Sequence, residues 1–190
     1  MTNDDTTRAI IDKLGDQPGE TLTPERIETI QTAMHEGLGR FINNTSYFVL
    51  GSYDEEERPL LEAVRDQLAS DATASNSDDG VNAFLMDDIL DVSEFFTSKV
   101  KLLVSYADHM VGVYEHSQGG HAWEAGYIDQ PTYRKQTRAF YRTYKTEEEQ
   151  YAAYGMVAHD LLSMERVDRA YTRTTPKELR DCVADAYAAD

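Results

Sequence analysis

From Ser46 onward, short apolar runs alternate with segments of helical periodicity, and this alternation constrains the fold more than any other feature. Residues 47–50, 83–86, 110–114, 137–142 and 168–172 form the apolar or β-branched runs that are typical of buried strands. Segments with apolar residues at helical spacing lie between them. Strands that alternate with helices predict an α/β fold, in which helices cover both faces of a five-stranded parallel sheet.

The same patterns divide the chain into two parts. Residues 46–190 form the predicted α/β domain, with helices over residues 96–107, from near His121, over 146–164 and from Thr175-Pro176, and with a loop over 70–80. Residues 1–45 are predicted to form a helical extension. In it, Thr23-Pro24-Glu25 is a typical helix start, and an apolar stripe follows at helical spacing. The extension could pack on the domain or form a homo-oligomer contact, and the sequence does not distinguish between these two arrangements.

The charge of the chain restricts its partners. Thirty-five acidic and 18 basic residues give a net charge of -17, which repels nucleic-acid backbones and anionic membrane surfaces. The N-terminus lacks a signal-peptide pattern, no apolar stretch is long enough to span a bilayer, and Cys182 has no partner for an internal disulfide, so we expect a cytoplasmic protein. The composition resembles that of halophilic archaeal proteins, while a mesophilic acidic protein remains the alternative.

Three features fall where predicted strands end. Gly51-Ser52-Tyr53 follows the first strand, Asp87-Asp88 follows the second, and a loop after the third leads to Glu124. Ligands of parallel sheets bind beyond the carboxyl ends of the strands. We therefore predict the binding site at this edge. Asp88 would bind a ribose hydroxyl or, equally, cap the following segment.

The segment around Glu124 combines a glycine pair with the start of a helix. Gly119 and Gly120 allow a tight turn and close approach of a ligand, and the helix N-terminus favours a phosphate or ribose oxygen. Trp123 could form one wall of the pocket. A carboxylate at its mouth suits attack on an anomeric carbon or stabilisation of an oxocarbenium-like transition state. The alternative is an ordinary acidic residue that stabilises its helix.

Residues 120–127, the run Gly-His-Ala-Trp-Glu-Ala-Gly-Tyr, resemble the glutamate segment of the nucleoside 2-deoxyribosyltransferase family. Residues 107–114 are similar to the strand that precedes it there. The resemblance implies a flavodoxin-like fold, cleavage or transfer at a nucleoside N-glycosidic bond, and Glu124 as nucleophile. This family and the related TIR-like domains place a nucleotide-contacting loop at the position of Gly51, Ser52 and Tyr53.

The loop before Glu124 departs from the transferase pattern. His116-Ser117-Gln118 stands where transferases usually carry an aspartate, which favours hydrolysis or binding over transfer. A serine in this loop is similar to that of the nucleoside-monophosphate hydrolase branch, which implies that Ser117 contacts phosphate. The expected ligand is a nucleoside, a nucleotide or NAD, and no metal or organic cofactor is required. The rival hypothesis is a non-catalytic nucleotide-binding or signalling module of the same fold.

Two further patterns bear on binding. The five histidines do not have the spacing of a metal site. Residues 133–144 interleave three tyrosines with Arg134, Lys135, Arg138 and Arg142, a pattern that can bind single-stranded nucleic acid. Within so acidic a chain it indicates an edge strand or a local anion site instead.

Overall fold

The computed structural model describes residues 45–74, 81–89, 96–116 and 121–187, and the isolated residues Thr23, Glu25, Glu28, Thr29 and Thr32. The predicted helical extension over residues 1–45 therefore lies almost wholly outside the described residues. So do residues 75–80 of the predicted loop.

The core of the domain is a five-stranded sheet whose strand order is β2-β1-β3-β4-β5. All neighbouring strands pair in parallel. This is the flavodoxin-like arrangement, and it confirms the predicted fold class. The strands are β1 (Thr45–Gly51), β2 (Val81–Phe84), β3 (His109–Tyr114), β4 (Thr137–Arg142) and β5 (Ala170–Arg173).

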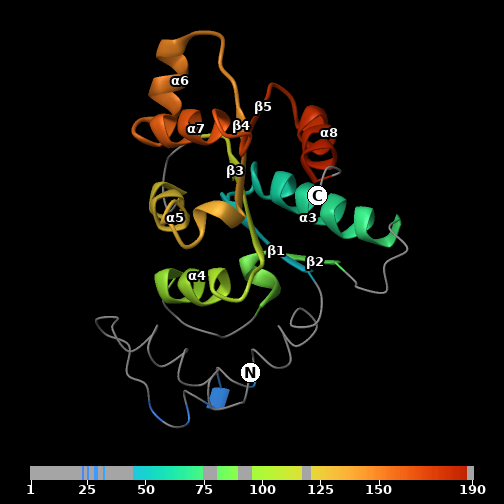
Figure 1. The fold of residues 1–190 in the computed structure, drawn as a ribbon. Coiled ribbons are helices and arrows are strands. Elements are labelled where there is room, and N and C mark those ends of the chain that lie inside the picture. Colours follow the sequence, from blue (N-terminus) through green and yellow to red (C-terminus); the bar gives the residue numbers. More distant parts are fainter. Residues whose placement is uncertain are drawn as a thin grey trace.

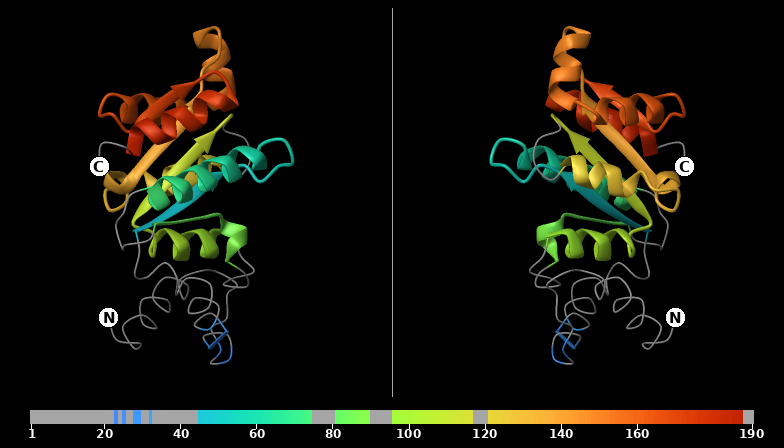
Figure 2. Two further views of the ribbon diagram at one scale, coloured as in Figure 1. Left: turned by 90° about the vertical axis from the view of Figure 1, so that its right-hand side faces the viewer. Right: turned by 90° about the vertical axis from the view of Figure 1, so that its left-hand side faces the viewer.

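Helices cover both faces of the sheet, as the alternating pattern requires (Figures 1 and 2). One face carries α3 (Arg58–Ala74) and α8 (Pro176–Tyr187). The other carries α4 (Phe96–Val104), α5 (His121–Ile128), α6 (Glu147–Tyr154) and α7 (Val157–Glu165). None of the helices in the described ranges is long and apolar enough to cross a bilayer.

Successive strand residues enter opposite layers of the core, because side chains alternate across a sheet. Val49 packs with Leu61 and Val64 beneath α3, whereas Phe48 and Leu50 join the cluster beneath α4. Both layers are apolar, which explains why the strands have continuous apolar runs instead of alternating polar residues.

The long helix predicted over residues 146–164 is wrong: it is two helices. Gly155 separates α6 from α7 with a φ of 54°, and its N–H donates to the carbonyl of Tyr151 at 2.8 Å. A positive φ suits glycine and ends the first helix. The chain then turns and begins α7 at Val157.

Other boundaries differ from the sequence prediction by a few residues. Residues 70–74, predicted as a loop, complete α3. The second strand ends at Phe84 and not at residue 86, because the Asp88 carboxylate accepts the N–H of Leu85 at 2.8 Å and closes a 3-10 turn, η1 (Met86–Asp88). The fifth strand begins at Ala170, since Asp168 has a turn conformation with a φ of 55°.

Candidate functional site

The carboxyl edge of the sheet brings several of the predicted site residues together. Tyr53 follows β1, Asp88 lies in η1 after β2, and Glu124 lies in the first turn of α5 after β3. The charges of Glu124 and Asp88 both act on the hydroxyl of Tyr53, so the three side chains share one region. The parallel pairing of β1 with β2 and β3 produces this convergence.

Glu124 is the most unusual side chain of this region. It is 1% exposed, and within the described part of the chain its Oε2 has no hydrogen-bond partner. Burial removes the water that would stabilise the charged form, and it raises the pKa of the carboxyl to about 8. Buried carboxyl groups with strongly perturbed pKa values are concentrated at functional sites.

Tyr53 fixes one side of the region. Its hydroxyl accepts the N–H of Met86 at 2.7 Å, which ties the loop after β1 to the loop after β2. Burial raises the pKa of Tyr53, and the carboxylates of Glu124, Asp87 and Asp88 raise it further. Tyr53 therefore remains a neutral phenol whose proton is available to a neighbouring acceptor.

Tyr114 was missed by the sequence analysis, which assigned it only as the last residue of a strand. It is 2% exposed, and its pKa is raised by burial and then by the charges of Glu124 and Asp160. Its ring lies over Gly112, where a β-carbon would come within 2.5 Å of the ring. The sequence does contain a signal for this packing: Gly112 lies two residues before Tyr114 on the same face of β3 and leaves room for its ring.

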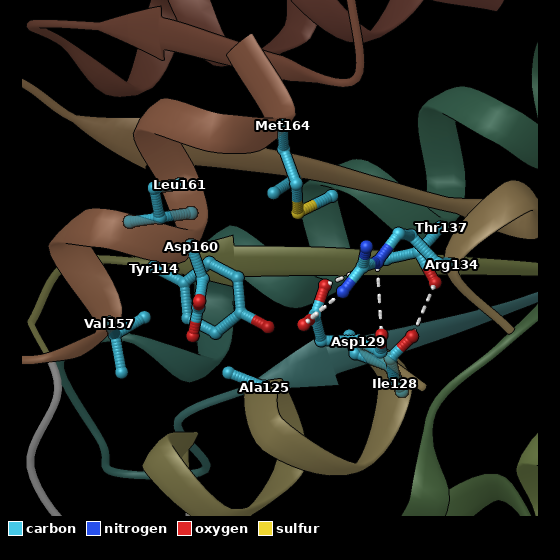
Figure 3. A pocket seen from close by; sticks show the side chains of 11 residues that line it. Tyr114, Ala125, Ile128, Asp129, Arg134, Thr137, Val157, Asp160, Leu161 and Met164 are labelled. Atoms are coloured by element: carbon cyan, nitrogen blue, oxygen red, sulfur yellow. Dashed lines mark hydrogen bonds and ion pairs between the residues drawn. The ribbon is translucent and has the colours of Figure 1, made fainter. Parts of the chain in front are cut away.

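A crevice extends from Tyr114 between α5 and α7 (Figure 3). Its walls are largely apolar, with Asp160 beside Tyr114 and an ion pair of Arg134 with Asp129 at 2.7 Å. Burial and the nearby Asp129 carboxylate raise the pKa of Asp160. Ala125, the residue after Glu124 in α5, also lines this crevice. The helix that carries Glu124 therefore forms one wall of the apolar space.

Three predicted site residues make structural contacts. A β-carbon at Gly51 would lie 2.6 Å from the carbonyl oxygen of Val113, so glycine permits the close approach of β1 and β3. The Ser52 hydroxyl donates to the Asp54 carboxylate at 3.0 Å and accepts the Asp54 N–H. Asp88 accepts the N–H of Leu85 and pairs with Arg65 at 3.4 Å, so it caps the start of its own turn, η1, and not the following segment as predicted.

The loop between β3 and α5 carries the remaining predicted residues. Ser117, Gly119 and Gly120 lie outside the described residues, and of Trp123 only the backbone, in α5, is described. The loop leaves β3 at His116, whose Nε2 lies 2.8 Å from a carboxylate oxygen of Glu57.

The residue before His116, Glu115, anchors the end of β3 to β4 and β5. Its carboxylate accepts hydrogen bonds from Arg173, which is 3% exposed, and from Arg142 at 3.5 Å. Sequence analysis did not identify this pairing, because residues 115 and 173 meet only once β3, β4 and β5 are aligned.

Among the described residues, no group of three or more His, Cys, Asp or Glu side chains could hold a metal ion. The arrangement that the structure does describe offers a carboxyl group that changes charge near pH 8, beside two phenols. Such a group can donate a proton when neutral and attack an electrophilic carbon when ionised.

Comparison with known proteins assigns the chain to a family but does not indicate an activity. No curated protein matches the chain. A model of a family of unknown function, DUF8170, matches residues 3–189, nearly the whole sequence. The chain therefore belongs to the DUF8170 family.

Proposed function

We propose that the chain hydrolyses the N-glycosidic bond of a nucleoside, a nucleotide or NAD, with Glu124 as the nucleophile. One observation supports this most strongly: the Glu124 carboxyl group at the carboxyl edge of the sheet is 1% exposed, and its Oε2 has no hydrogen-bond partner among the residues that the structure describes. A buried polar atom without a partner destabilises a fold, so its presence calls for a role other than stability.

The proposed reaction has two steps. The ionised Glu124 carboxylate attacks the anomeric carbon, and the electron pair of the carbon–nitrogen bond leaves with the base. A nucleobase then takes a proton from water and leaves hydroxide, whereas nicotinamide leaves NAD as a neutral molecule without a proton. In the second step water attacks the same carbon, the bond to Glu124 breaks and the carboxylate is regenerated; the proton of this water neutralises the hydroxide or, with NAD, passes to solvent. Tyr53 and Tyr114 would position the substrate and supply hydrogen bonds from neutral phenols.

The resemblance of residues 120–127 to the deoxyribosyltransferase family supports the same assignment, as does the flavodoxin-like strand order. Gln118 in place of an aspartate favours hydrolysis over sugar transfer. In this proposal Ser117, Gly119 and Gly120 hold a phosphate, while Ser52, Tyr53, Asp88 and Trp123 contact base or sugar.

A second function, nucleotide binding without turnover, is favoured by the ionisation of Glu124. Because its pKa is about 8, the Glu124 carboxyl group is neutral in most molecules at pH 7. A neutral carboxyl group donates a hydrogen bond to a ligand but does not attack it. The two functions therefore differ in whether base is released.

Base release separates these functions. The full chain would be incubated at high salt with deoxynucleosides, nucleoside monophosphates and NAD, and free base would be measured by chromatography. We expect release by the wild type and by Glu148→Gln, a matched change at an exposed residue of α6, and a loss of about 1,000-fold or more in Glu124→Gln. Ligand binding without release in the wild type would favour the non-catalytic function.

A further inference from the structure

The amino edge of the sheet, opposite Glu124, carries a polar hollow that the proposed function does not use. The hollow is open to solvent and has a volume of about 360 Å3, a size that suits a small molecule. It lies where β3, β4 and β5 begin. The residues that line it are His109, Lys135, Gln136, Thr137, Arg138, Val167, Asp168 and Arg169.

The charge of this hollow is opposite to that of the chain. Its lining has three cationic side chains, Lys135, Arg138 and Arg169, and one carboxylate, Asp168. The whole chain has 35 acidic and 18 basic residues. A local excess of positive charge within a protein of net charge -17 attracts small anions to this one place.

The sheet register brings the two arginines to the same level. Ala139 of β4 pairs with Ala170 of β5, so Arg138 and Arg169, one residue earlier, are neighbours on adjacent strands. Adjacent strands lie about 4.8 Å apart. Lys135 comes from the 3-10 turn η2 (Arg134–Gln136), which leads directly into β4.

Packing holds both guanidinium groups in place. The Cζ atom of Arg138 lies 4.3 Å from the centre of the Tyr187 ring, at the end of α8. Arg169 donates a hydrogen bond to the carbonyl of Arg134. Side chains that are fixed before binding lose less conformational entropy when a ligand arrives.

A structural explanation accounts for only part of this cluster. Cations at this edge can stabilise the C-termini of α5 and α7, which end there. Arg134 does so for α5: it donates to the Asp129 carbonyl at 3.0 Å and turns toward the Asp129 carboxylate (Figure 3). Lys135 is exposed and lines the hollow, so capping of α5 does not explain it.

We propose that this hollow is an anion site that binds the phosphate group of a small molecule. Guanidinium groups pair with the oxygens of a phosphate through two parallel hydrogen bonds. The three cations and the one carboxylate of the lining leave a net charge of +2, which balances the two negative charges of a phosphate monoester. A carboxylate carries one charge and two oxygens, and it would leave part of this donor set unused. The site is independent of Glu124 and of the proposed hydrolase activity.

Calorimetric titration of the full chain tests the proposal. Inorganic phosphate, methyl phosphate and acetate would each be added at constant ionic strength, with chloride as the balancing anion. We expect both phosphates to bind, and to bind at least tenfold more tightly than acetate. Stronger binding of methyl phosphate would identify a phosphate monoester as the ligand class, and equal binding would identify free phosphate.

Variants locate the binding to this hollow. Lys135→Glu changes an exposed residue and should weaken phosphate binding at the hollow about tenfold or more, and Arg138→Gln with Arg169→Gln should abolish binding there, leaving only the phosphate binding proposed for Ser117, Gly119 and Gly120. Arg180→Gln, on the exposed side of α8, is the control and should leave binding at the hollow unchanged. An absence of phosphate binding to the wild type, or undiminished binding to Lys135→Glu, would overturn the proposal.

Discussion

At the scale of single residues, Glu124 combines a cost to stability with a proposed function. Its native pKa of about 8 lies above the ordinary value of 4.5, so the folded state holds the proton more tightly than the unfolded state. The contribution of this carboxyl to stability is therefore present in full below pH 4.5 and is lost as the pH rises through 8. Other carboxylates titrate too, so the effect must be isolated with a variant.

The variant is Glu124→Gln, which is neutral at every pH. The difference in unfolding free energy between variant and wild type should shift in favour of the variant by about 3–5 kcal/mol between pH 4.5 and pH 9. Chemical denaturation at a series of pH values measures this difference. Two curves that run parallel over the whole range would show that Glu124 ionises normally.

Gly51 makes a second prediction at this scale. Because an added β-carbon would meet the carbonyl oxygen of Val113 at 2.6 Å and Leu61 at 2.7 Å, Gly51→Ala should reduce the free energy of unfolding by about 1–3 kcal/mol. Thermal denaturation would detect the loss. Gly126→Ala is the control: its β-carbon meets nothing within 4 Å, and alanine favours a helix over glycine, so this variant should be at least as stable as the wild type.

At the scale of elements, the break between α6 and α7 decides how the helices meet the sheet. Tyr154, the last residue of α6, is buried, and its hydroxyl lies 2.8 Å from the Arg142 carbonyl and 3.0 Å from that of Tyr114. A continuous helix through Gly155 would direct α7 away from β4 and β5. The turn at Gly155 therefore places α7 over the crevice that contains Tyr114.

Gly155→Ala tests the importance of this turn. A φ of 54° is unfavourable for alanine, so the variant should lose about 1 kcal/mol of stability. Gly155→Asn should lose at least as much, because asparagine tolerates a positive φ mainly in the left-handed helical region, and the ψ of -127° places Gly155 outside it. Equal stability of wild type and Gly155→Ala, measured by denaturant unfolding, would show that the turn is not strained by a side chain.

Local patterns were enough to predict most of these elements. The sheet, the position of α5 and the start of α8 follow from apolar runs, glycines and Thr175-Pro176. The break at Gly155 was missed because helical periodicity continues on both sides of it. The sequence predicted that Glu124 lies near the ends of the strands. It did not predict the role of Tyr114, because the burial of Tyr114 beside Glu124 and Asp160 depends on how α5 and α7 pack.

At the scale of the whole molecule, the two edges of the sheet have different chemistry. The carboxyl edge holds Glu124 with Tyr53 and Asp88, and the amino edge holds Lys135, Arg138 and Arg169. The chain as a whole has a net charge of -17, so the cationic amino edge is a local exception to its composition. A sheet with both features can bind two ligands at sites that lie a full strand length apart.

The pH dependence of base release tests the central claim most directly. If ionised Glu124 is the nucleophile, the rate of release from the best substrate should rise about tenfold per pH unit below the pKa and level off above pH 8. Glu124→Gln should show no such rise. No base release at any pH, or a rate that is independent of pH and survives in Glu124→Gln, would contradict the assignment of Glu124 as the catalytic carboxylate.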